Sequence, residues 1–423
     1  MDRFRVLGPS RLEGTVTPSG AKNAALPALA AALLTDEPLI LSRVPRVRDV
    51  VTMQRLLAHL GVGSTQRQDV VTLTRSSAGE NDAPYELVKT MRAGVLVLGP
   101  LVARRGEAKV SLPGGCAIGL RPIDQHLAGL EALGASVRLE HGYVLTSVPG
   151  GRLRGARFRF AQPTVTGTEN LLMAAALAEG TTVLENCARE PEVEDLSRLL
   201  VAMGAQIEGV GGDRLTIEGV SALRGAEHRI VADRIEGGTY LLAAAITGGD
   251  VRLDDCDPRA LQPLADKLAL AGAEIEIGDT TLRLVAPRPL RAVDATTAPH
   301  PGFPTDLQAQ YMALMTQAQG TAILCETVFE NRFQHVPELC RMGADVRLEG
   351  RLAHVHGPTR LSGANVMATD LRASACLVLA GLCAEGETVV DRIYHLDRGY
   401  EAMETKLNAL GANVVRSSGG STS

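Results

Sequence analysis

The hydrophobic and polar positions of the chain first reveal six segments that are apolar on nearly every side. Helices of this kind are buried, because a helix at a protein surface keeps only one apolar stripe. The pattern therefore predicts six buried helices. They cover residues 22–34, 87–103, 168–180, 234–249, 306–320 and 370–386.

The same parts return in the same order after each of these helices. A short apolar strand follows, as in LILSRV at 39–44, and then a helix with a single apolar stripe, as in VEDLSRLLVAMGA at 193–205. The second helix leads into a glycine turn of the type LGA, and most repeats continue with two alternating strands. The turn glycines are spaced by 73, 70, 68, 71 and 68 residues, at Gly61, Gly134, Gly204, Gly272, Gly343 and Gly411.

Six repeats of about seventy residues therefore account for the whole chain. One repeat cannot bury its first helix alone, so we expect an α/β fold of two lobes with three repeats each. The buried helices lie inside each lobe and the sheets outside. The first lobe is expected at 22–229 and the second at 1–21 plus 230–423. The strand FRVLG at 4–8 has no repeat of its own and is expected to pair into the C-terminal lobe.

Composition and charge narrow the classes of function. Aromatic residues make up 3% of the 423 residues, Trp is absent and the net charge is −5, so nucleic acid and anionic membranes are not expected partners. The chain shows no apolar signal region and no apolar run of about 20 residues, which favours a cytoplasmic protein. Seven cysteines without a CxxC pair indicate reduced thiols and no zinc site. We expect a monomer without metal or cofactor, and a disordered tail at 417–423.

Polar and charged residues gather in the first turns of the predicted buried helices. Helix N-termini carry free N–H groups and partial positive charge, and added Lys or Arg makes them suited to phosphate. The pattern predicts a site for a ligand with several negative charges. Thr166, Asp233 and Asp306 can instead be ordinary N-caps, and that alternative stays open. The residues are Lys22, Asn23, Lys89, Arg92, Thr166, Thr168, Glu169, Asp233, Arg234, Asp306, Asp370 and Arg372.

The loops after the strands hold further candidate chemistry. The stretch LPGGCAIGLRPID at 112–124 places Cys116 between glycines and ahead of Arg121. The thiol can be a buried filler, a redox group or a catalytic group, and the neighbouring arginine favours the last. Two later loops carry Arg332 and Arg398, and an ion pair of Arg332 with Asp370 across the lobes is an alternative to substrate binding. The other six cysteines and His126, His300, His335 and His395 are interpreted as structural.

Several of these stretches together resemble one known family. They are SGAKNAALP, KTMRAG, LPGGCAIGLRPID, ENRFQHVPEL, ATDLRASA and YHLDRGYE, and the match runs from residue 1 to about residue 415. They are similar to the enolpyruvyl transferases that act on UDP-N-acetylglucosamine (the 1-carboxyvinyltransferases). The resemblance implies a two-lobed inside-out α/β barrel that closes on the nucleotide sugar in a cleft between the lobes. It also implies transfer of the enolpyruvyl group of phosphoenolpyruvate to the sugar 3′-hydroxyl, with release of phosphate.

The resemblance further implies roles for single residues. Cys116 is expected to protonate the methylene carbon of phosphoenolpyruvate and Asp306 to accept the hydroxyl proton, with Lys22 and Arg398 completing the catalytic set. Phosphoenolpyruvate binding is implied for Lys22, Asn23, Arg121 and Arg398. UDP-N-acetylglucosamine binding is implied for Asn23, Arg92, Arg121, Pro122, Ile123, Asp124, Gln125, Thr164, Val165, Asp306 and Val328. Arg332, Asp370 and Arg372 are expected in supporting roles.

One stretch departs from the family pattern, and other functions stay open. Family members read close to SVGAT after a basic residue, whereas this chain has QPTVTGTEN at 162–170, and Gln162 brings no charge to a diphosphate. A transferase of the same fold that acts on shikimate 3-phosphate is one alternative, and the Cys116 loop argues against it. A nucleotide-sugar sensor without catalysis is another, but Lys22, Cys116, Asp306 and Arg398 are all present. A thiol that serves only redox sensing is a further alternative.

Overall fold

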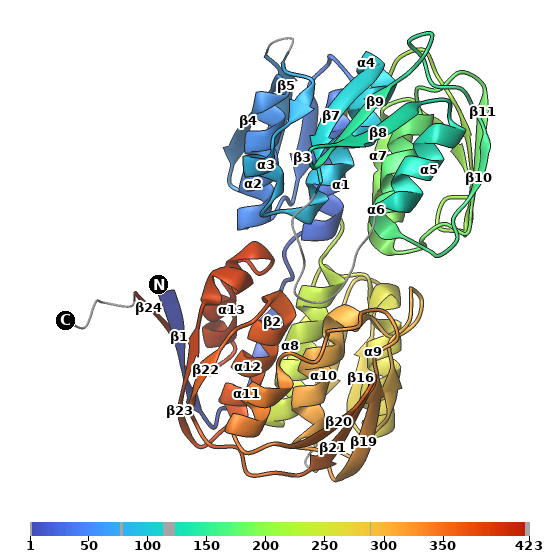
Figure 1. The fold of residues 1–423 in the computed structure, drawn as a ribbon. Helices are drawn as coiled ribbons and strands as arrows, with labels where there is room; N and C mark the ends of the chain where they lie inside the picture. Colours follow the sequence, from blue (N-terminus) through green and yellow to red (C-terminus); the bar gives the residue numbers. More distant parts are fainter. Residues whose placement is uncertain (1, 77–78, 113–122, 288, 419–423) are drawn as a thin grey trace. The chain divides into compact units, whose positions relative to one another are not determined.

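The computed structural model describes residues 2–76, 79–112, 123–287 and 289–418, which form two compact units. We call residues 20–231 the N-terminal unit and residues 2–19 plus 232–418 the C-terminal unit. Each unit contains its own hydrophobic core. The chain passes from one unit to the other at 19–20 and at 231–232. Figure 1 shows the elements of both units in sequence colours.

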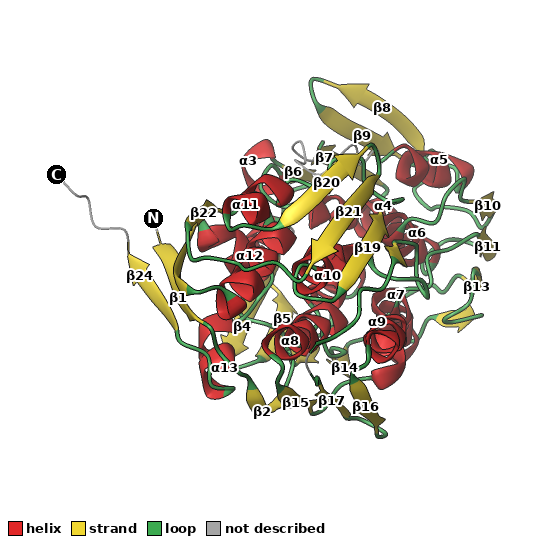
Figure 2. Ribbon diagram, turned by 90° about the horizontal axis from the view of Figure 1, so that it is seen from below, coloured by secondary structure: helices red, strands yellow, loops and turns green. Residues whose placement is uncertain are grey.

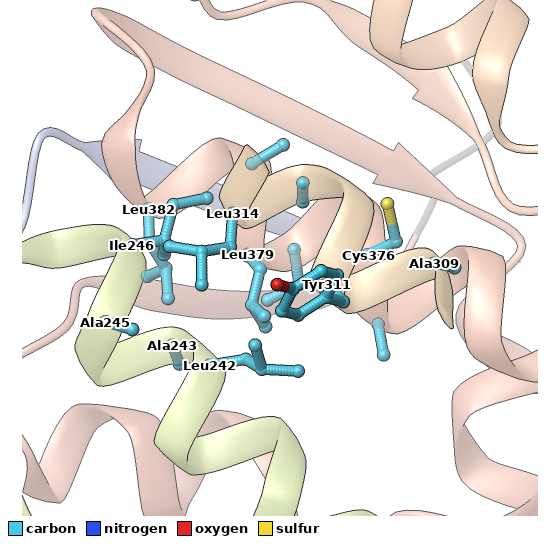
Figure 3. Packing of buried hydrophobic residues seen from close by; sticks show 14 of the residues in the cluster. Leu242, Ala243, Ala245, Ile246, Ala309, Tyr311, Leu314, Cys376, Leu379 and Leu382 are labelled. Carbon is cyan, nitrogen blue, oxygen red and sulfur yellow. The ribbon is translucent and has the colours of Figure 1, made fainter. Parts of the chain in front are cut away.

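The core of the C-terminal unit is built from three helices whose side chains are buried on all sides. They are α8 (Arg234–Thr247), α10 (Gln308–Met315) and α12 (Leu371–Cys383). Figure 2 shows them inside this unit with the strands outside, and Figure 3 shows side chains of all three helices packed in one cluster. Each fully buried leucine contributes about 1.5–3 kcal/mol to the free energy of folding. The expected burial of these helices is confirmed.

The core helices of the N-terminal unit are α1 (Lys22–Ala31), α4 (Leu98–Arg105) and α6 (Val165–Ala175). The single helix expected at 87–103 was wrong. The chain there forms α3 (Tyr85–Val88), the 3₁₀ turn η2 (Arg92–Val97) and then α4. Pro100 explains the late start of α4, because a proline lacks the N–H that a helix interior requires and fits only in the first turn. Of the six helices, only α4 and α8 end on a left-handed glycine, Gly106 and Gly248.

Each four-stranded sheet combines strands of one repeat with an outer strand from another repeat of the same unit, and all six sheets share one strand order. A short outer strand pairs in parallel with the first strand of the repeat, which pairs antiparallel with one arm of a hairpin. In the N-terminal unit the sheets are β14(Ala226–Arg229)-β3(Leu39–Ser42)-β5(Val70–Arg75)-β4(Val62–Arg67), β6(Asp82–Ala83)-β7(Glu107–Ser111)-β9(Tyr143–Ser147)-β8(Ser136–Glu140) and β10(Arg157–Arg159)-β11(Thr181–Glu185)-β13(Arg214–Glu218)-β12(Gln206–Glu208). In the C-terminal unit they are β2(Glu13–Val16)-β15(Asp250–Leu253)-β17(Leu282–Val285)-β16(Glu274–Ile277), β18(Ala295–Thr296)-β19(Gly320–Cys325)-β21(Leu352–Gly357)-β20(Asp345–Glu349) and β22(Asn365–Met367)-β23(Gly386–Asp391)-β1(Asp2–Gly8)-β24(Val414–Ser418).

The outer strands close each unit into a ring of three repeats. In the N-terminal unit, β14 follows the third repeat and pairs with β3 of the first repeat. In the C-terminal unit the N-terminal residues perform the same task. Strand β1 takes the hairpin position between β23 and β24, and β2 pairs with β15. The expectation that FRVLG pairs into the C-terminal lobe is confirmed, and residues 2–16 supply the last two strands of the sixth repeat.

The second helix of each repeat ends in the glycine turn that set the period. All six turn glycines have positive φ, between 89° at Gly61 and 104° at Gly204 and Gly272. A side chain disfavours this backbone conformation, which is why glycine recurs at these positions. These helices are α2 (Arg48–His59), α5 (Asp124–Ala132), α7 (Pro191–Ala202), α9 (Pro258–Ala271), α11 (Val336–Arg341) and α13 (Met403–Ala409).

The end of the described chain corrects one expectation. Ser417 and Ser418 were expected in a disordered tail, but they are the last residues of β24 and pair with Arg3 and Asp2 of β1. Backbone pairing with the interior strand β1 orders these two residues, although their small polar side chains are typical of a disordered tail. None of the described helices reaches the length and apolarity that crossing a bilayer requires.

Candidate active site

Lys22 and Asn23 lie at the start of α1 in the N-terminal unit. The Nζ of Lys22 is 3.2 Å from Oδ2 of Asp49, which belongs to the first turn of α2, and the two side chains are 12% and 7% exposed. A lysine is disfavoured at a helix N-terminus, and the carboxylate offsets this cost while fixing the ammonium group. Sequence reasoning missed Asp49, and the only signal for it was an acidic residue beside two arginines in RVRDV.

His126 is buried in α5 of the N-terminal unit and joins this helix to α6. Its Nδ1 is 3.0 Å from Asn170 Nδ2, which must donate, so the ring proton sits on Nε2, 3.3 Å from Thr166 Oγ1. Asn170 also donates to the carbonyl of Val95 and accepts from the Gly99 N–H. Burial, followed by the nearby charge of Arg92, lowers the pKa of His126 to about 4. The ring is therefore neutral near pH 7, which favours its structural interpretation over a proton shuttle.

Gln125, in the first turn of α5, holds the segment that precedes α6. Its Oε1 accepts from the N–H groups of Ala161 and Gln162 at 2.7 and 3.2 Å, and its Nε2 donates to the Gln162 carbonyl at 3.2 Å. Thr164 then caps α6 by accepting from the Gly167 N–H at 3.3 Å. The N-cap is thus Thr164, and the N-cap interpretation of Thr166 was wrong. Val165 is the first residue of α6, so the Gln125 side chain holds the backbone three to four residues before this helix begins.

The structure describes only some of the other site residues that were predicted in this unit. Ile123 is buried and precedes α5, whereas Asp124 is exposed at its first position. Arg92 is half-buried at the start of η2. Cys116, Arg121 and Pro122 lie outside the described residues.

Asp306 occupies the 3₁₀ turn η3 (Thr305–Leu307) of the C-terminal unit, between two arginines. Arg332 Nη2 donates to Oδ1 at 2.7 Å, and Arg372 Nη2 donates to Oδ2 at 2.8 Å. The arginine side chains are 3% and 6% exposed, whereas that of Asp306 is 27% exposed. The N-cap of α10 is Leu307, without a side-chain cap, so the N-cap interpretation of Asp306 was wrong. The carboxylate is oriented by two guanidinium groups, and the Asp306 side chain is partly exposed.

Asp370 and Asp233 act as helix caps in the C-terminal unit. Asp370 accepts from the N–H groups of Arg372 and Ala373 at 2.7 and 3.1 Å. Asp233 accepts from those of Ile235 and Glu236 at 2.8 and 3.0 Å, which confirms its N-cap interpretation. The alternative that Arg332 and Asp370 form an ion pair across the lobes was wrong, because both residues belong to the C-terminal unit. The carboxylate that Arg332 contacts is that of Asp306.

Glu326 organises the loop that carries Val328. The buried Oε1 accepts from the N–H groups of Val328 and Phe329 at 2.8 and 3.1 Å, and Oε2 accepts from the Thr305 hydroxyl at 2.8 Å. Since Thr305 is the neighbour of Asp306 in η3, one carboxylate links two predicted site residues. Sequence reasoning missed Glu326, which ends a strand without any motif of its own.

Arg398 is the last residue of η4 (Ile393–Arg398), where it is half-buried. Burial, followed by the charge of Arg398, lowers the pKa of the neighbouring His395. His335 is buried as well, and burial lowers its pKa to about 4. Both histidines are thereby held neutral beside arginines. Within the described residues, no group of three or more His, Cys, Asp or Glu side chains is placed as metal ligands would be.

Two three-repeat units, with cationic and carboxylate residues at the first turns of their buried helices, define the class of fold. The family model of EPSP synthase (3-phosphoshikimate 1-carboxyvinyltransferase) matches residues 6–407. The chain belongs to the EPSP synthase family. It superimposes on the enolpyruvyl transferase NikO of Streptomyces tendae with a TM-score of 0.89 at 26% identity, covering 98% of this chain and 99% of that one.

The curated relatives narrow the comparison. The chain is 57% identical over 417 residues to the UDP-N-acetylglucosamine 1-carboxyvinyltransferase of Solibacter usitatus, covering 98% of this chain and 100% of the relative. It is 56% identical to the enzyme of that name from Koribacter versatilis, with 98% and 96% covered. An EPSP synthase of Acinetobacter baumannii has a TM-score of 0.77 at 18% identity over 99% of this chain and 100% of that one, which shows the fold alone. The fold and family expected from the sequence are confirmed.

Proposed function

We propose that the protein is a transferase that moves the enolpyruvyl group of phosphoenolpyruvate to the 3′-hydroxyl of UDP-N-acetylglucosamine and releases phosphate. This is the first committed step of peptidoglycan precursor synthesis. Identity of 56–57% over nearly the full length to two enzymes of that name carries the proposal. The enzyme acts on two small molecules, in the cytoplasm and as a monomer, and it needs no metal or cofactor.

The reaction is an addition followed by an elimination. Asp306 accepts the proton of the sugar hydroxyl, whose oxygen attacks C2 of phosphoenolpyruvate, while Cys116 gives a proton to the methylene carbon. The tetrahedral adduct then loses a proton from that carbon and expels phosphate, which restores the double bond. Lys22, Asn23, Arg121 and Arg398 hold the phosphate and carboxylate, because guanidinium and ammonium groups match these anions. General acid and base groups of this kind contribute about 10²–10⁴-fold each to the rate.

The residues to which we assign nucleotide-sugar binding come from both parts of the chain. Asn23, Arg92, Thr164 and Val165 belong to the N-terminal unit, together with the segment Arg121–Gln125. Asp306 and Val328 belong to the C-terminal unit, where Arg332, Asp370 and Arg372 support them. We therefore expect catalysis to require residues of both units. The partial exposure of the Asp306 side chain and the ion pair of Lys22 with Asp49 support these roles.

Phosphate release from phosphoenolpyruvate tests the proposal. The purified protein receives UDP-N-acetylglucosamine in one arm and shikimate 3-phosphate in the other, and each arm is repeated with Cys116→Ala. We expect release with the nucleotide sugar alone and its loss in the variant. Release that survives the substitution removes Cys116 from the role of acid. Release only with shikimate 3-phosphate contradicts the proposed substrate, and binding of the nucleotide sugar without any release indicates a sensor.

Gln125→Ala is expected to raise the KM for UDP-N-acetylglucosamine roughly fivefold while kcat changes little, which corresponds to a net loss of ~1 kcal/mol. The substitution frees the backbone at residues 161–162 and thereby the start of α6. Steady-state kinetics provides the measurement. Gln162→Ala is the matched control, because only the backbone of Gln162 takes part in these contacts. An unchanged KM in Gln125→Ala would show that the segment keeps its place without the amide.

A further inference from the structure

Behind Asp306, a buried ring of polar contacts runs through the C-terminal unit and returns to the same residue. Arg372, which holds Oδ2 of Asp306, donates from Nη1 to the Tyr400 hydroxyl at 3.3 Å, and its guanidinium carbon lies 5.6 Å from the Tyr400 ring centre. Gln310 Nε2 lies 3.2 Å from the same hydroxyl and 3.1 Å from the backbone carbonyl of Asp306. Side chain and backbone of Asp306 are therefore linked through Tyr400.

The direction of each hydrogen bond in this ring follows from the chemistry of its members. The Thr239 hydroxyl donates to the Ile235 carbonyl at 2.7 Å, so it can only accept from Tyr400, 2.9 Å away. The Tyr400 proton is thus directed to Thr239, which leaves its oxygen lone pairs for Arg372 and Gln310. Burial raises the pKa of Tyr400, and the hydroxyl keeps its proton near neutral pH.

Gln310 can take only one orientation in this ring. The Asp306 carbonyl accepts and cannot donate, so the amide nitrogen must face it. The amide oxygen, Oε1, is then buried without a hydrogen-bond partner within the described structure. Leaving a buried acceptor unpaired is costly, and the two N–H donors of Nε2 offset that cost by serving the Asp306 carbonyl and the hydroxyls of Tyr400 and Thr239. The donor contacts within the ring therefore fix the orientation of the Gln310 amide, although this orientation leaves Oε1 unpaired.

We propose that Tyr400 is a positioning residue that aligns Arg372 and, through it, the carboxylate of Asp306 with the sugar hydroxyl. The inference rests on the proposed function, in which Asp306 accepts the proton. Arg372 donates to Asp306 from Nη2 and to Tyr400 from Nη1. Because the guanidinium group is planar and rigid, the position of the Tyr400 hydroxyl constrains the orientation of the Asp306 carboxylate. Tyr400 itself lies deep in the core at 3% exposure, and its hydroxyl is held by α8, α10 and α12 at once.

Tyr400→Phe tests the proposal because it removes only the hydroxyl. We expect kcat for phosphate release to fall about tenfold, the effect of one hydrogen bond to a charged group, with the KM for UDP-N-acetylglucosamine within twofold. The matched control is Tyr311→Phe in α10, a buried tyrosine whose hydroxyl donates to the Val293 carbonyl at 3.0 Å. Both variants lose a buried hydrogen bond and their melting temperatures should fall alike, but Tyr311→Phe should keep its kcat.

A double-mutant cycle separates positioning from general stability. In an Arg372→Lys background, adding Tyr400→Phe should lower kcat less than twofold, because Tyr400 is proposed to act through the guanidinium group of Arg372, which this background lacks. The same tenfold loss in both backgrounds, or an equal loss in Tyr311→Phe, overturns the proposal. If Tyr400→Phe does not fold, Thr239→Val removes the acceptor of the Tyr400 proton, and its kcat should fall likewise. If the wild type is active and Tyr400→Phe has the same kcat for phosphate release, this inference alone is overturned. If the wild type itself releases no phosphate, the proposed function is overturned together with this inference.

Discussion

Asp306→Asn is expected to lower kcat for phosphate release by about 10³-fold, within the range of general base catalysis. The amide has nearly the size of the carboxylate but cannot accept the hydroxyl proton. It also leaves Arg332 and Arg372, which are almost fully buried, without the anion between them. Single-turnover and steady-state measurements with UDP-N-acetylglucosamine give the chemical step and the KM separately.

A matched control shows whether the loss arises from the site. Asp250→Asn removes a carboxylate that accepts two hydrogen bonds from one guanidinium group, that of Arg283 on the neighbouring strand, at 2.8 and 2.7 Å. This pair is exposed to solvent, so kcat should stay at the wild-type level and stability should change little. A kcat of Asp306→Asn within threefold of wild type would contradict the role of Asp306 as proton acceptor.

Deletion of residues 1–8 is expected to unfold the C-terminal unit. Strand β1 is interior to its sheet, and its removal leaves β24 without the strand that it pairs with. Phe4 and Val6 are fully buried in the core. Loss of one such aromatic side chain alone costs about 3–5 kcal/mol, so losing the strand exceeds the usual stability of a domain.

Limited proteolysis and urea unfolding provide the measurement. Residues 20–231 should remain as a protected fragment, since this unit closes its own ring through β14. Deletion of residues 419–423, beyond β24, is the control and should leave the unfolding midpoint and the activity unchanged. A truncated protein that unfolds in one transition at the wild-type midpoint would show that β1 contributes little.

The repeats could be predicted from the sequence because they depend on local rules. Six helices without a polar face must be buried, and six turn glycines at one period must take up positive φ. The break before α4 was missed, although Pro100 was visible, because an apolar pattern alone does not show where hydrogen bonds stop. Motif resemblance supplied the family and the residue roles, and the roles remain proposals.

The contacts that shape the candidate site could not be predicted. Asp306 and Arg372 are 66 residues apart in the chain, and Lys22 and Asp49 are 27 apart. Such pairs meet only because buried helices and second helices of the same unit pack side by side. Gln125 was predicted to bind substrate, yet its side chain is engaged by the chain itself, at residues 161–162. A pattern of residue types carries no information on which way a polar side chain turns.

The place of residues 2–16 has a consequence for how the protein emerges from a ribosome. These residues are synthesised before the other described elements, but β2 can pair only after β15 has been made, and β1 only after β23 and β24 have been made. Residues 20–231 can complete their ring while synthesis continues. The nascent chain therefore carries β1, with the apolar side chains of Phe4 and Val6, unpaired until β23 and β24 have been synthesised. Codon-dependent pausing late in the message, or a holdase that covers Phe4 and Val6, would then decide how much of the C-terminal unit reaches its native form.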